Sequence, residues 1–478
     1  MTARSWAPAA GPRRSLSLLV AVAGAAAVAV AGGAYAIGSY RLDDPTILPI
    51  VAAGLAAVTL GLWRLEYGLA LLIVLTPLAE NAPIAEPENA RLRVALVAWA
   101  MVLVGLQAVR SVLSGRRLEV PPVFAGALAF VGAALAAVPF AGDGQAAASK
   151  FLLLAGSVFI YLLIALFLDD WRSLRPIFAA LLVVGLVVAV HALWQYATGQ
   201  LSRVGFVSAT GAVEYRVASF FPHPNQLAGF VVLFVPLSIG LYRVFESPLA
   251  KAASLVLALV ALPAAIVTYS RGVLVALVAL VLAFARNRKA WPLIAAAAVL
   301  VVLLAPAAWQ DRVADVGRLD RPEIATRLDF WEASVAMFQA HPVVGVGLNN
   351  FEEAYAGLEL TGRSFLPGGG LTAPETAHNL YLNTLAEQGL VGIAALALLV
   401  LAAARMVLAL RRSHDPRIRG FGLGLMGAGI ALLVSNLFDV TFVDPKTSML
   451  AWTLLGVGAA LQRIDARTRG EAAASPPE

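Results

Sequence analysis

The sequence has no cysteine and few charged residues. Charged side chains make up 13% of its 478 residues, whereas 60% of the residues are hydrophobic. Soluble domains carry about 25% charged residues. A chain with so few charges cannot cover itself with a water-compatible surface, so we expect the lipid bilayer to be its solvent. The absence of cysteine also excludes disulfides and cysteine-ligated metals.

The net charge of +6 does not indicate a nucleic-acid partner. The arginines and lysines lie in short connectors between apolar runs and do not gather on one face. Such a distribution is typical of the residues that set the topology of a membrane protein.

The apolar runs predict an all-α polytopic transmembrane helix bundle. A membrane-spanning helix needs about 20 mostly apolar residues. By this measure about 12 to 14 spans are expected. The candidates lie at residues 16–38, 45–63, 66–80, 94–113, 120–140, 150–168, 174–194, 225–245, 251–269, 272–286, 291–308, 389–410, 420–440 and 447–462.

The positions of the cations predict the orientation. Alternate connectors hold the basic clusters, such as Arg110, Arg116 and Arg117, while the opposite connectors hold acids such as Asp439 and Asp444. Because cytoplasmic loops are enriched in Lys and Arg, both termini are expected in the cytoplasm. Cleavage after Ala34-Tyr35-Ala36, as in a signal peptide, is the alternative to an uncleaved first span and changes nothing downstream.

The predicted spans divide the chain into five parts. The N-terminal transmembrane bundle is expected at 1–215, central transmembrane helices with outward arginines at 216–308, an extracytoplasmic loop at 309–388, the C-terminal transmembrane helices at 389–465 and a cytoplasmic tail at 466–478.

The outer loop contains an amphipathic pattern. After Pro322 in a plausible first helical turn, apolar residues recur at helical spacing up to Pro342. They are Ile324, Leu328, Trp331, Val335 and Phe338. This side of the helix could lie on the membrane or on the bundle. The glycines of Pro367–Gly370 indicate a flexible stretch, which we interpret as a mobile lid.

The end of the loop is the most informative segment. If it is helical, Asn379, Asn383 and Glu387 form a polar stripe at spacings of four. His378 lies at the top of this helix, and imidazole, with its pKa near neutrality, suits a general base that removes a hydroxyl proton. A histidine and an asparagine that merely end a helix at the wet interface are the alternative, and the local pattern leaves both open.

Three arginines oppose the topology trend: Arg216, Arg271 and Arg327 are all expected on the outer side. The planar guanidinium suits bidentate binding of phosphate oxygens. Their position therefore favours an anionic, membrane-embedded substrate such as a lipid diphosphate. Arg271 could instead extend to the interface, and Arg327 could pair with Glu323.

A second outward histidine, His223, lies between two prolines. A turn or capping role is expected for it, and Asn225 could cap the helix that follows. The histidines have no spacing that suits a metal site, so no metal or other cofactor is predicted.

These residues resemble the O-antigen ligase/polymerase superfamily of bacterial membrane glycosyltransferases. The resemblance covers about residues 218–410. It rests on Arg216 with Pro224-Asn225, on Ser270-Arg271-Gly272, on Arg327–Trp331 leading to His341–Gly347, and on His378-Asn379 followed by nine residues and then a glycine, Gly389.

The resemblance implies a protein of the bacterial cytoplasmic membrane that transfers a glycan from an undecaprenyl-diphosphate carrier to an acceptor hydroxyl outside, without metal and with inversion. It implies that His378 is the base or orients the acceptor, and that Arg216 and Arg271, with Arg327, hold the diphosphate. The superfamily also contains polysaccharide polymerases and protein O-oligosaccharyltransferases, and the motif does not separate them. A transporter of lipid-linked glycans is the alternative from another class; such proteins place ionisable residues near the bilayer midplane.

Overall fold

The computed structural model describes residues 59–79, 119–202, 204–207, 213–284, 322–358 and 374–474, together with several positions between 103 and 114. The predicted spans at 16–38 and 291–308 lie outside the described residues, as do most of the spans at 45–63 and 94–113. The predicted lid at 367–370 also lies outside them.

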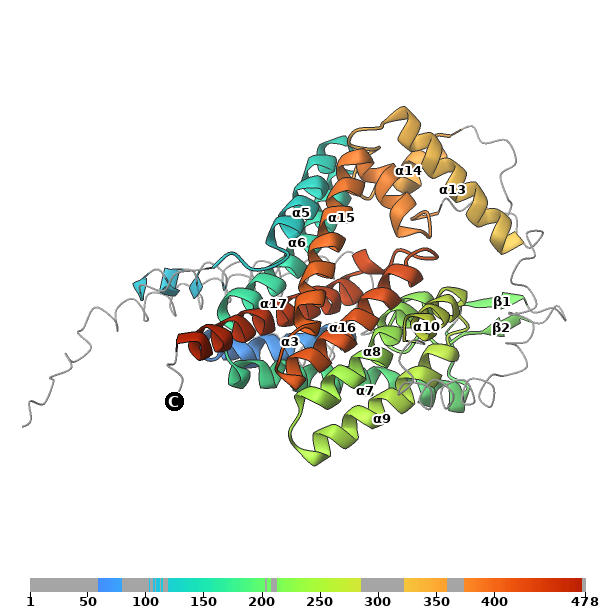
Figure 1. The fold of residues 1–478 in the computed structure, drawn as a ribbon. Coiled ribbons are helices and arrows are strands. Elements are labelled where there is room, and N and C mark those ends of the chain that lie inside the picture. Colours follow the sequence, from blue (N-terminus) through green and yellow to red (C-terminus); the bar gives the residue numbers. More distant parts are fainter. Residues whose placement is uncertain are drawn as a thin grey trace, which may run out of the picture.

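The described part of the chain is built almost entirely from helices (Figure 1). Their bounds are α3 (Leu65–Ala79), α5 (Phe124–Ala137), η1 (Val138–Phe140), α6 (Gly144–Phe167), α7 (Trp171–Thr198), α8 (Pro224–Val244), α9 (Pro248–Ile266), α10 (Arg271–Phe284), α13 (Pro322–Ala340), α14 (Phe351–Ala356), α15 (Leu380–Arg411), α16 (Pro416–Ser435), η3 (Thr441–Val443) and α17 (Pro445–Ala474).

Six of the described helices are long and apolar enough to cross a membrane: α6, α7, α8, α9, α15 and α16. This confirms the predicted all-α polytopic bundle and makes the chain a multi-pass membrane protein. Several predicted spans have bounds close to those of the observed helices. For example, the span expected at 225–245 is α8 at Pro224–Val244. A short hairpin was not predicted: β1 (Gly205–Val207) pairs antiparallel with β2 (Val213–Tyr215) in the connector before α8.

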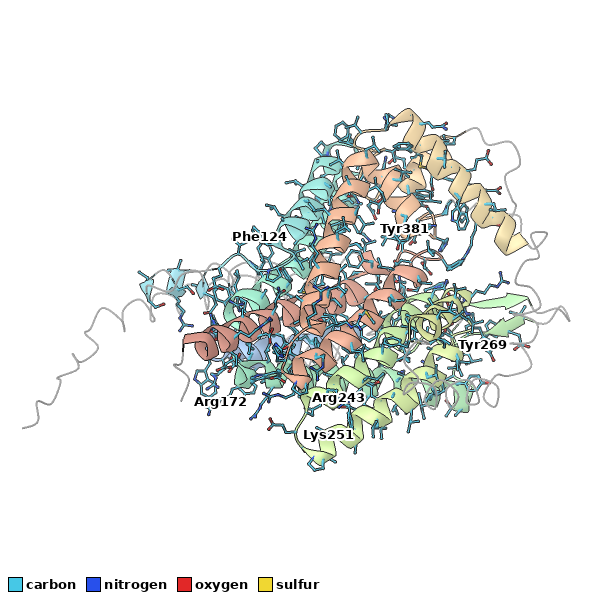
Figure 2. All side chains as sticks on the ribbon, in the orientation of Figure 1. Phe124, Arg172, Arg243, Lys251, Tyr269 and Tyr381 are labelled. Atoms are coloured by element: carbon cyan, nitrogen blue, oxygen red, sulfur yellow. The ribbon has the colours of Figure 1, made fainter. Side chains whose placement is uncertain are left out.

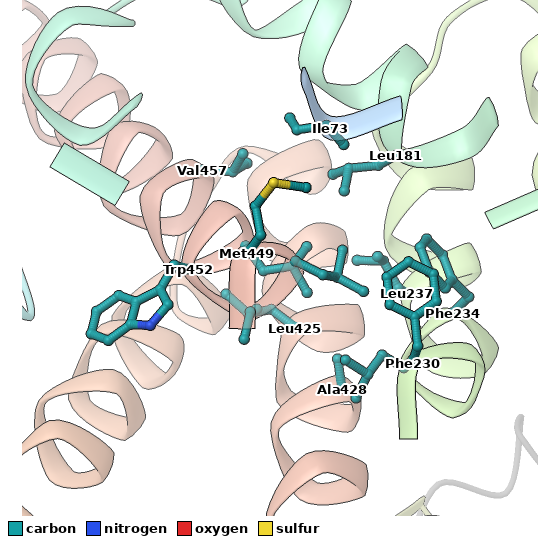
Figure 3. Close-up of a cluster of buried hydrophobic side chains, with 14 of the residues drawn as sticks. Ile73, Leu181, Phe230, Phe234, Leu237, Leu425, Ala428, Met449, Trp452 and Val457 are labelled. Atoms are coloured by element: carbon teal, nitrogen blue, oxygen red, sulfur yellow. The ribbon is translucent and has the colours of Figure 1, made fainter. Parts of the chain in front are cut away.

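The core lies where α8, α16 and α17 meet (Figure 3). Phe230 and Phe234 of α8 lie near Leu425 of α16 and Met449 of α17 in this cluster. The backbones of α8 and α16 approach so closely that a Cβ on Gly424 would lie 3.0 Å from the Cα of Gly240. Small residues at such crossings replace the hydrophobic driving force that lipid does not supply, because they allow dense backbone packing.

Basic residues that were expected on the same side of the membrane meet at one end of the bundle. Glu246, between α8 and α9, pairs with Arg417 of α16 at 2.9 Å and with Arg175 of α7 at 3.8 Å. Figure 2 shows Arg172, Arg243 and Lys251 at this edge and Tyr269 and Tyr381 away from it. The orientation of these two ends in the membrane stays a prediction.

The amphipathic helix of the predicted outer loop is α13. Phe330, Ala333, Ser334 and Met337 are buried, while Leu328 and Val335 of the predicted stripe are exposed. Of the two alternatives left open for the stripe, the membrane or the bundle, Leu328 and Val335 do not pack on the described part of the bundle. Small side chains at Ala333 and Ser334 let the α13 backbone approach its neighbour, and spacing alone does not reveal that preference. The side chain of Ile324 lies outside the described ones.

Candidate functional site

The three arginines singled out in the sequence line one pocket. It lies between α8, α10 and the end of α16, and we call it the arginine pocket; its walls include Arg216, Asn225, Tyr269, Ser270, Arg271, Arg327, Ser435, Phe438, Asp439 and Thr441. These residues are up to 225 positions apart in the sequence, as are Arg216 and Thr441. Three guanidinium groups around one cavity produce a positive potential suited to an anion with several oxygens.

Hydrogen bonds donated by its guanidinium group hold Arg216 in this pocket. Its side chain is 6% exposed. Nε donates to the backbone oxygen of Thr268 at 2.7 Å, and Nη2 donates to Oδ1 of Asn225 at 2.6 Å. The guanidinium therefore ties the segment before α8 to the turn before α10. This bracing fixes the distance between Arg216 and Arg271.

A fully buried lysine supports the same segment. Nζ of Lys446, at the start of α17, donates to the backbone oxygens of Pro77, at 3.1 Å, and of Phe220. Buried ammonium groups need such partners because an unpaired charge is costly away from water. Lys446 thus anchors the chain between Arg216 and His223.

His378 lines a second cavity, which we call the histidine chamber. This cavity has a volume of about 500 Å³. Its polar walls are Lys150, His223, Gln226, Asn349, Glu375, Thr376, His378, Asn383, Thr384, Glu387, Gln388, Asp439, Thr441 and Asp444. The His378 side chain remains 37% exposed, which leaves room for a second reactant beside the ring.

Asp439 joins the two cavities because it lines both of them. Its Oδ1 lies 3.7 Å from Nδ1 of His378 and accepts a hydrogen bond from the Val440 backbone at 2.9 Å. Burial alone would raise the pKa of the Asp439 carboxyl, but His378, the Val440 amide and the charge of Arg327 outweigh it and lower that pKa to about 2. Asp439 is therefore an anion at physiological pH, placed to stabilise a positive charge on His378.

The polar stripe predicted after His378 fixes the backbone around it. Asn379 is the N-cap of α15 and accepts from the backbone of Tyr381 and Leu382. Asn383 accepts from the Ala377 backbone at 3.0 Å, so it closes the turn that carries His378. Glu387 accepts from the Phe351 backbone at the start of α14. Asn383 and Glu387 also line the histidine chamber, so they hold the turn that carries His378 and at the same time form part of the cavity wall.

Gly389, separated from Asn379 by nine residues, breaks α15. Its φ of 61° and ψ of −153° interrupt the helix. The segment after His341 supplies hydrogen-bond acceptors for the backbone amides that follow the break. Leu390 and Val391 donate to the backbone oxygens of Pro342 and Val343 at 2.9 and 3.1 Å. In return, Val346 and Gly347 donate to the oxygens of Ala386 and Glu387. The glycine motif thus serves as a backbone joint between the outer loop and α15.

His223 has the capping role that was expected for it, whereas Asn225 does not cap the helix. The N-cap of α8 is His223, whose Nδ1 accepts from the Asn225 backbone at 3.1 Å, so the prediction that Asn225 caps this helix is wrong. Pro224 fits the first helical position, where no amide donor is needed. Burial and the nearby Arg216 lower the pKa of His223 to about 4, so its ring is neutral near pH 7.

Unusual backbone angles gather around the two cavities. Ser219, Tyr269, Asn349 and His378 all have positive φ, between 49° and 58°. Non-glycine residues in this region are strained, and such strain clusters at functional sites because the surrounding structure must hold it in place. Two of these four residues, Asn349 and His378, line the chamber, and Tyr269 lines the arginine pocket.

The structure thus brings His378 and His223 together in one cavity and the three arginines in the neighbouring one. Sequence reasoning assigned no such role to Asp439, Lys150, Gln226 or Gln388. Asp439 had been noted only as an outward acid. The one indication that it belonged to the site was its position. Asp439 follows a span and lies in a connector expected on the same side of the membrane as His378.

Residues 253–397 match the family described as O-Antigen ligase. The matched segment starts in α9 and ends in α15, so it includes Arg271, Arg327 and His378, whereas Arg216 and Asp439 lie outside it. No curated protein matches the chain.

Proposed function

We propose that this chain, whose residues 253–397 match the family described as O-Antigen ligase, transfers a glycan from a polyprenyl-diphosphate carrier to an acceptor hydroxyl. The reaction would take place at the outer surface of the bacterial cytoplasmic membrane, with both termini in the cytoplasm. The partners are the lipid-linked donor and a lipid or glycan acceptor.

One observation carries the proposal: the cavity lined by Arg216, Arg271 and Arg327 shares Asp439 with the cavity lined by His378. A diphosphate leaving group needs cations around its oxygens, and a hydroxyl nucleophile needs a base. The arginine pocket supplies the cations and the histidine chamber supplies the base. Because Asp439 lines both cavities, donor and acceptor can meet beside it.

The residues suit a direct displacement. Neutral His378 takes the proton of the acceptor hydroxyl while the hydroxyl oxygen forms a bond to the anomeric carbon of the donor. The bond between that carbon and the diphosphate oxygen breaks, and the electron pair leaves with the diphosphate. Arg216, Arg271 and Arg327 stabilise the negative charge on the leaving group, and Asp439 stabilises the imidazolium. Attack from the opposite face inverts the configuration of the sugar.

The function is tested with the full-length protein in lipid nanodiscs and an undecaprenyl-diphosphate-linked oligosaccharide as donor. Arg271→Ala and His378→Ala should each lower transfer to a supplied acceptor at least 100-fold, which is the range of general-base and electrostatic contributions. Arg243→Ala, at the opposite end of α8, is the matched control and should retain activity. Wild-type rates in either site variant, with normal amounts of protein in the membrane, would overturn the proposal.

The acceptor distinguishes a ligase from a polymerase. With the donor alone, a polymerase lengthens the lipid-linked glycan, whereas a ligase needs a separate acceptor. Movement of the lipid-linked glycan across vesicles without any transfer would instead support a transporter and contradict the enzyme assignment.

A further inference from the structure

The histidine chamber contains buried amide oxygens without donors. Gln388 of α15 is 5% exposed. Its Oε1 and the Oε1 of Gln226 on α8 are both buried, and neither has a hydrogen-bond partner among the described residues. Both side chains line the chamber. Since buried polar atoms are nearly always paired, two such acceptors in one cavity indicate a ligand that donates hydrogen bonds.

The charges on the wall of the chamber exclude a polyanionic ligand such as the diphosphate proposed for the arginine pocket. Lys150 and His378 face four carboxylic side chains across the cavity, Glu375, Glu387, Asp439 and Asp444. A phosphate group would meet more acids than cations here, in contrast to the arginine pocket. Amides and carboxylates together suit a neutral compound with many hydroxyl groups, because each hydroxyl both donates and accepts. A volume of about 500 Å³ is within the usual range of small-molecule sites.

The chamber lies on the side of the nucleophile. His378 lines the chamber and not the arginine pocket, while the three arginines line the pocket and not the chamber. A base must lie within hydrogen-bond reach of the hydroxyl that it deprotonates. The sugar that carries this hydroxyl therefore has to enter the chamber.

We infer that the histidine chamber is the binding site for the acceptor sugar and that Gln388 and Gln226 accept hydrogen bonds from its hydroxyl groups. This inference rests on the proposed function. Lys150 is the one lysine among the described residues of the chamber wall and can donate to a ring or hydroxyl oxygen. The acceptor is thus recognised as a neutral sugar and not through an anionic group.

Binding without turnover tests the site. The probes are the methyl glycosides of glucose, galactose and N-acetylglucosamine, with wild-type protein in nanodiscs and ligand-observed saturation-transfer NMR. At least one glycoside should bind, and its signal should fall at least 5-fold in Gln388→Met and in Gln226→Met. Methionine keeps the length of the side chain and removes the acceptor. Because the two residues lie on different helices, a folding defect at one position does not explain both results.

Gln462→Met is the matched control. Its Oε1 is also buried without a hydrogen-bond partner among the described residues, but Gln462 lies on α17 and not on the chamber wall. Binding should be unchanged in this variant. Any of three results would overturn the inference. The first is that none of the three glycosides binds, and the second is that both chamber variants bind as well as the wild type. The third is a loss of binding in Gln462→Met equal to that in the chamber variants.

A competition experiment with the lipid-linked donor completes the test. Undecaprenyl-diphosphate-linked oligosaccharide should leave the bound glycoside in place because its diphosphate occupies the arginine pocket. Displacement would assign the chamber to the donor glycan and overturn the inference. The proposed function fails independently, if Arg271→Ala retains transfer, whatever the glycosides show.

Discussion

Nδ1 of His378 and Oδ1 of Asp439 lie 3.7 Å apart at the point where the two cavities of the site adjoin. The histidine comes from the turn before α15 and the aspartate from the turn after α16, so the pair joins two turns that lie far apart in the sequence. The backbone of Leu380 holds the two turns together, since it donates to the oxygens of Asn436 and Asp439 at 2.9 and 3.0 Å.

Asp439→Asn should separate catalysis from donor binding. The amide keeps the shape and an oxygen for the Val440 backbone but removes the charge that stabilises protonated His378. The maximal transfer rate is expected to fall on the order of 10-fold or more. The KM for the donor should stay equal or fall, because a carboxylate no longer repels the diphosphate. Steady-state kinetics measures both, with Asp415→Asn at the N-cap of α16 as the control. A higher donor KM with an unchanged rate contradicts this role.

Arg216→Lys should weaken donor binding although it conserves the charge. A lysine ammonium cannot reach Thr268 and Asn225 with the geometry of the guanidinium fork. Loss of one charge-assisted hydrogen bond of about 1.5 to 3 kcal/mol corresponds to roughly 10- to 100-fold. We expect an increase of this order in the KM for the donor. Arg243→Lys, at the other end of α8, should leave that KM unchanged. Equal kinetics for the two variants would refute the bracing role of Arg216.

Gly389→Ala should destabilise the protein. A Cβ on Gly389 would lie 2.4 Å from the backbone oxygen of Val343, and the residue has a φ of 61°. Strain and overpacking together are expected to cost about 2 kcal/mol or more. Thermal unfolding in detergent, followed by size-exclusion chromatography, should show a lower midpoint.

Gly429→Ala in α16 is the matched control for this variant. A Cβ there meets nothing within 4 Å. Alanine also favours a helix over glycine by roughly 0.5 to 1 kcal/mol. The midpoint of this variant should not fall. A stable Gly389→Ala protein would show that the joint tolerates a side chain.

His223 should make stability depend on pH. Burial first, and then the charge of Arg216, lower its pKa from an ordinary value of 6.5 to about 4 in the folded protein. Between these two values the unfolded chain binds more protons than the folded one, so stability falls as the pH drops from about 6.5 to 4. Above pH 6.5 the contribution of His223 is complete.

His223→Asn tests this dependence because asparagine can still cap α8 but does not titrate. The decrease in thermal midpoint between pH 6.5 and 4 should be smaller in the variant than in the wild type. Parallel curves for the two proteins would exclude His223 as the titrating group.

The bundle was largely predictable because the bilayer imposes a simple rule. Every backbone polar group in a span must be paired within its own helix. Apolar runs therefore mark helices such as α8 and α9 with errors of a few residues. The cations also predicted which connectors meet, since Arg175 and Arg417 both reach Glu246. The packed side of α13 was not predictable, because that side depends on close approach at Ala333 and Ser334.

Within the site, the sequence by itself determined the candidate residues: the three arginines, His378 and Gly389. Those assignments follow from hydropathy and charge, which act locally along the chain. Only the tertiary structure decided that the arginines line one cavity, that His378 lines the next, and that Asp439 separates them. These relationships depend on how helices distant in sequence cross, and a crossing is set by side-chain packing over the whole bundle, which no local pattern records.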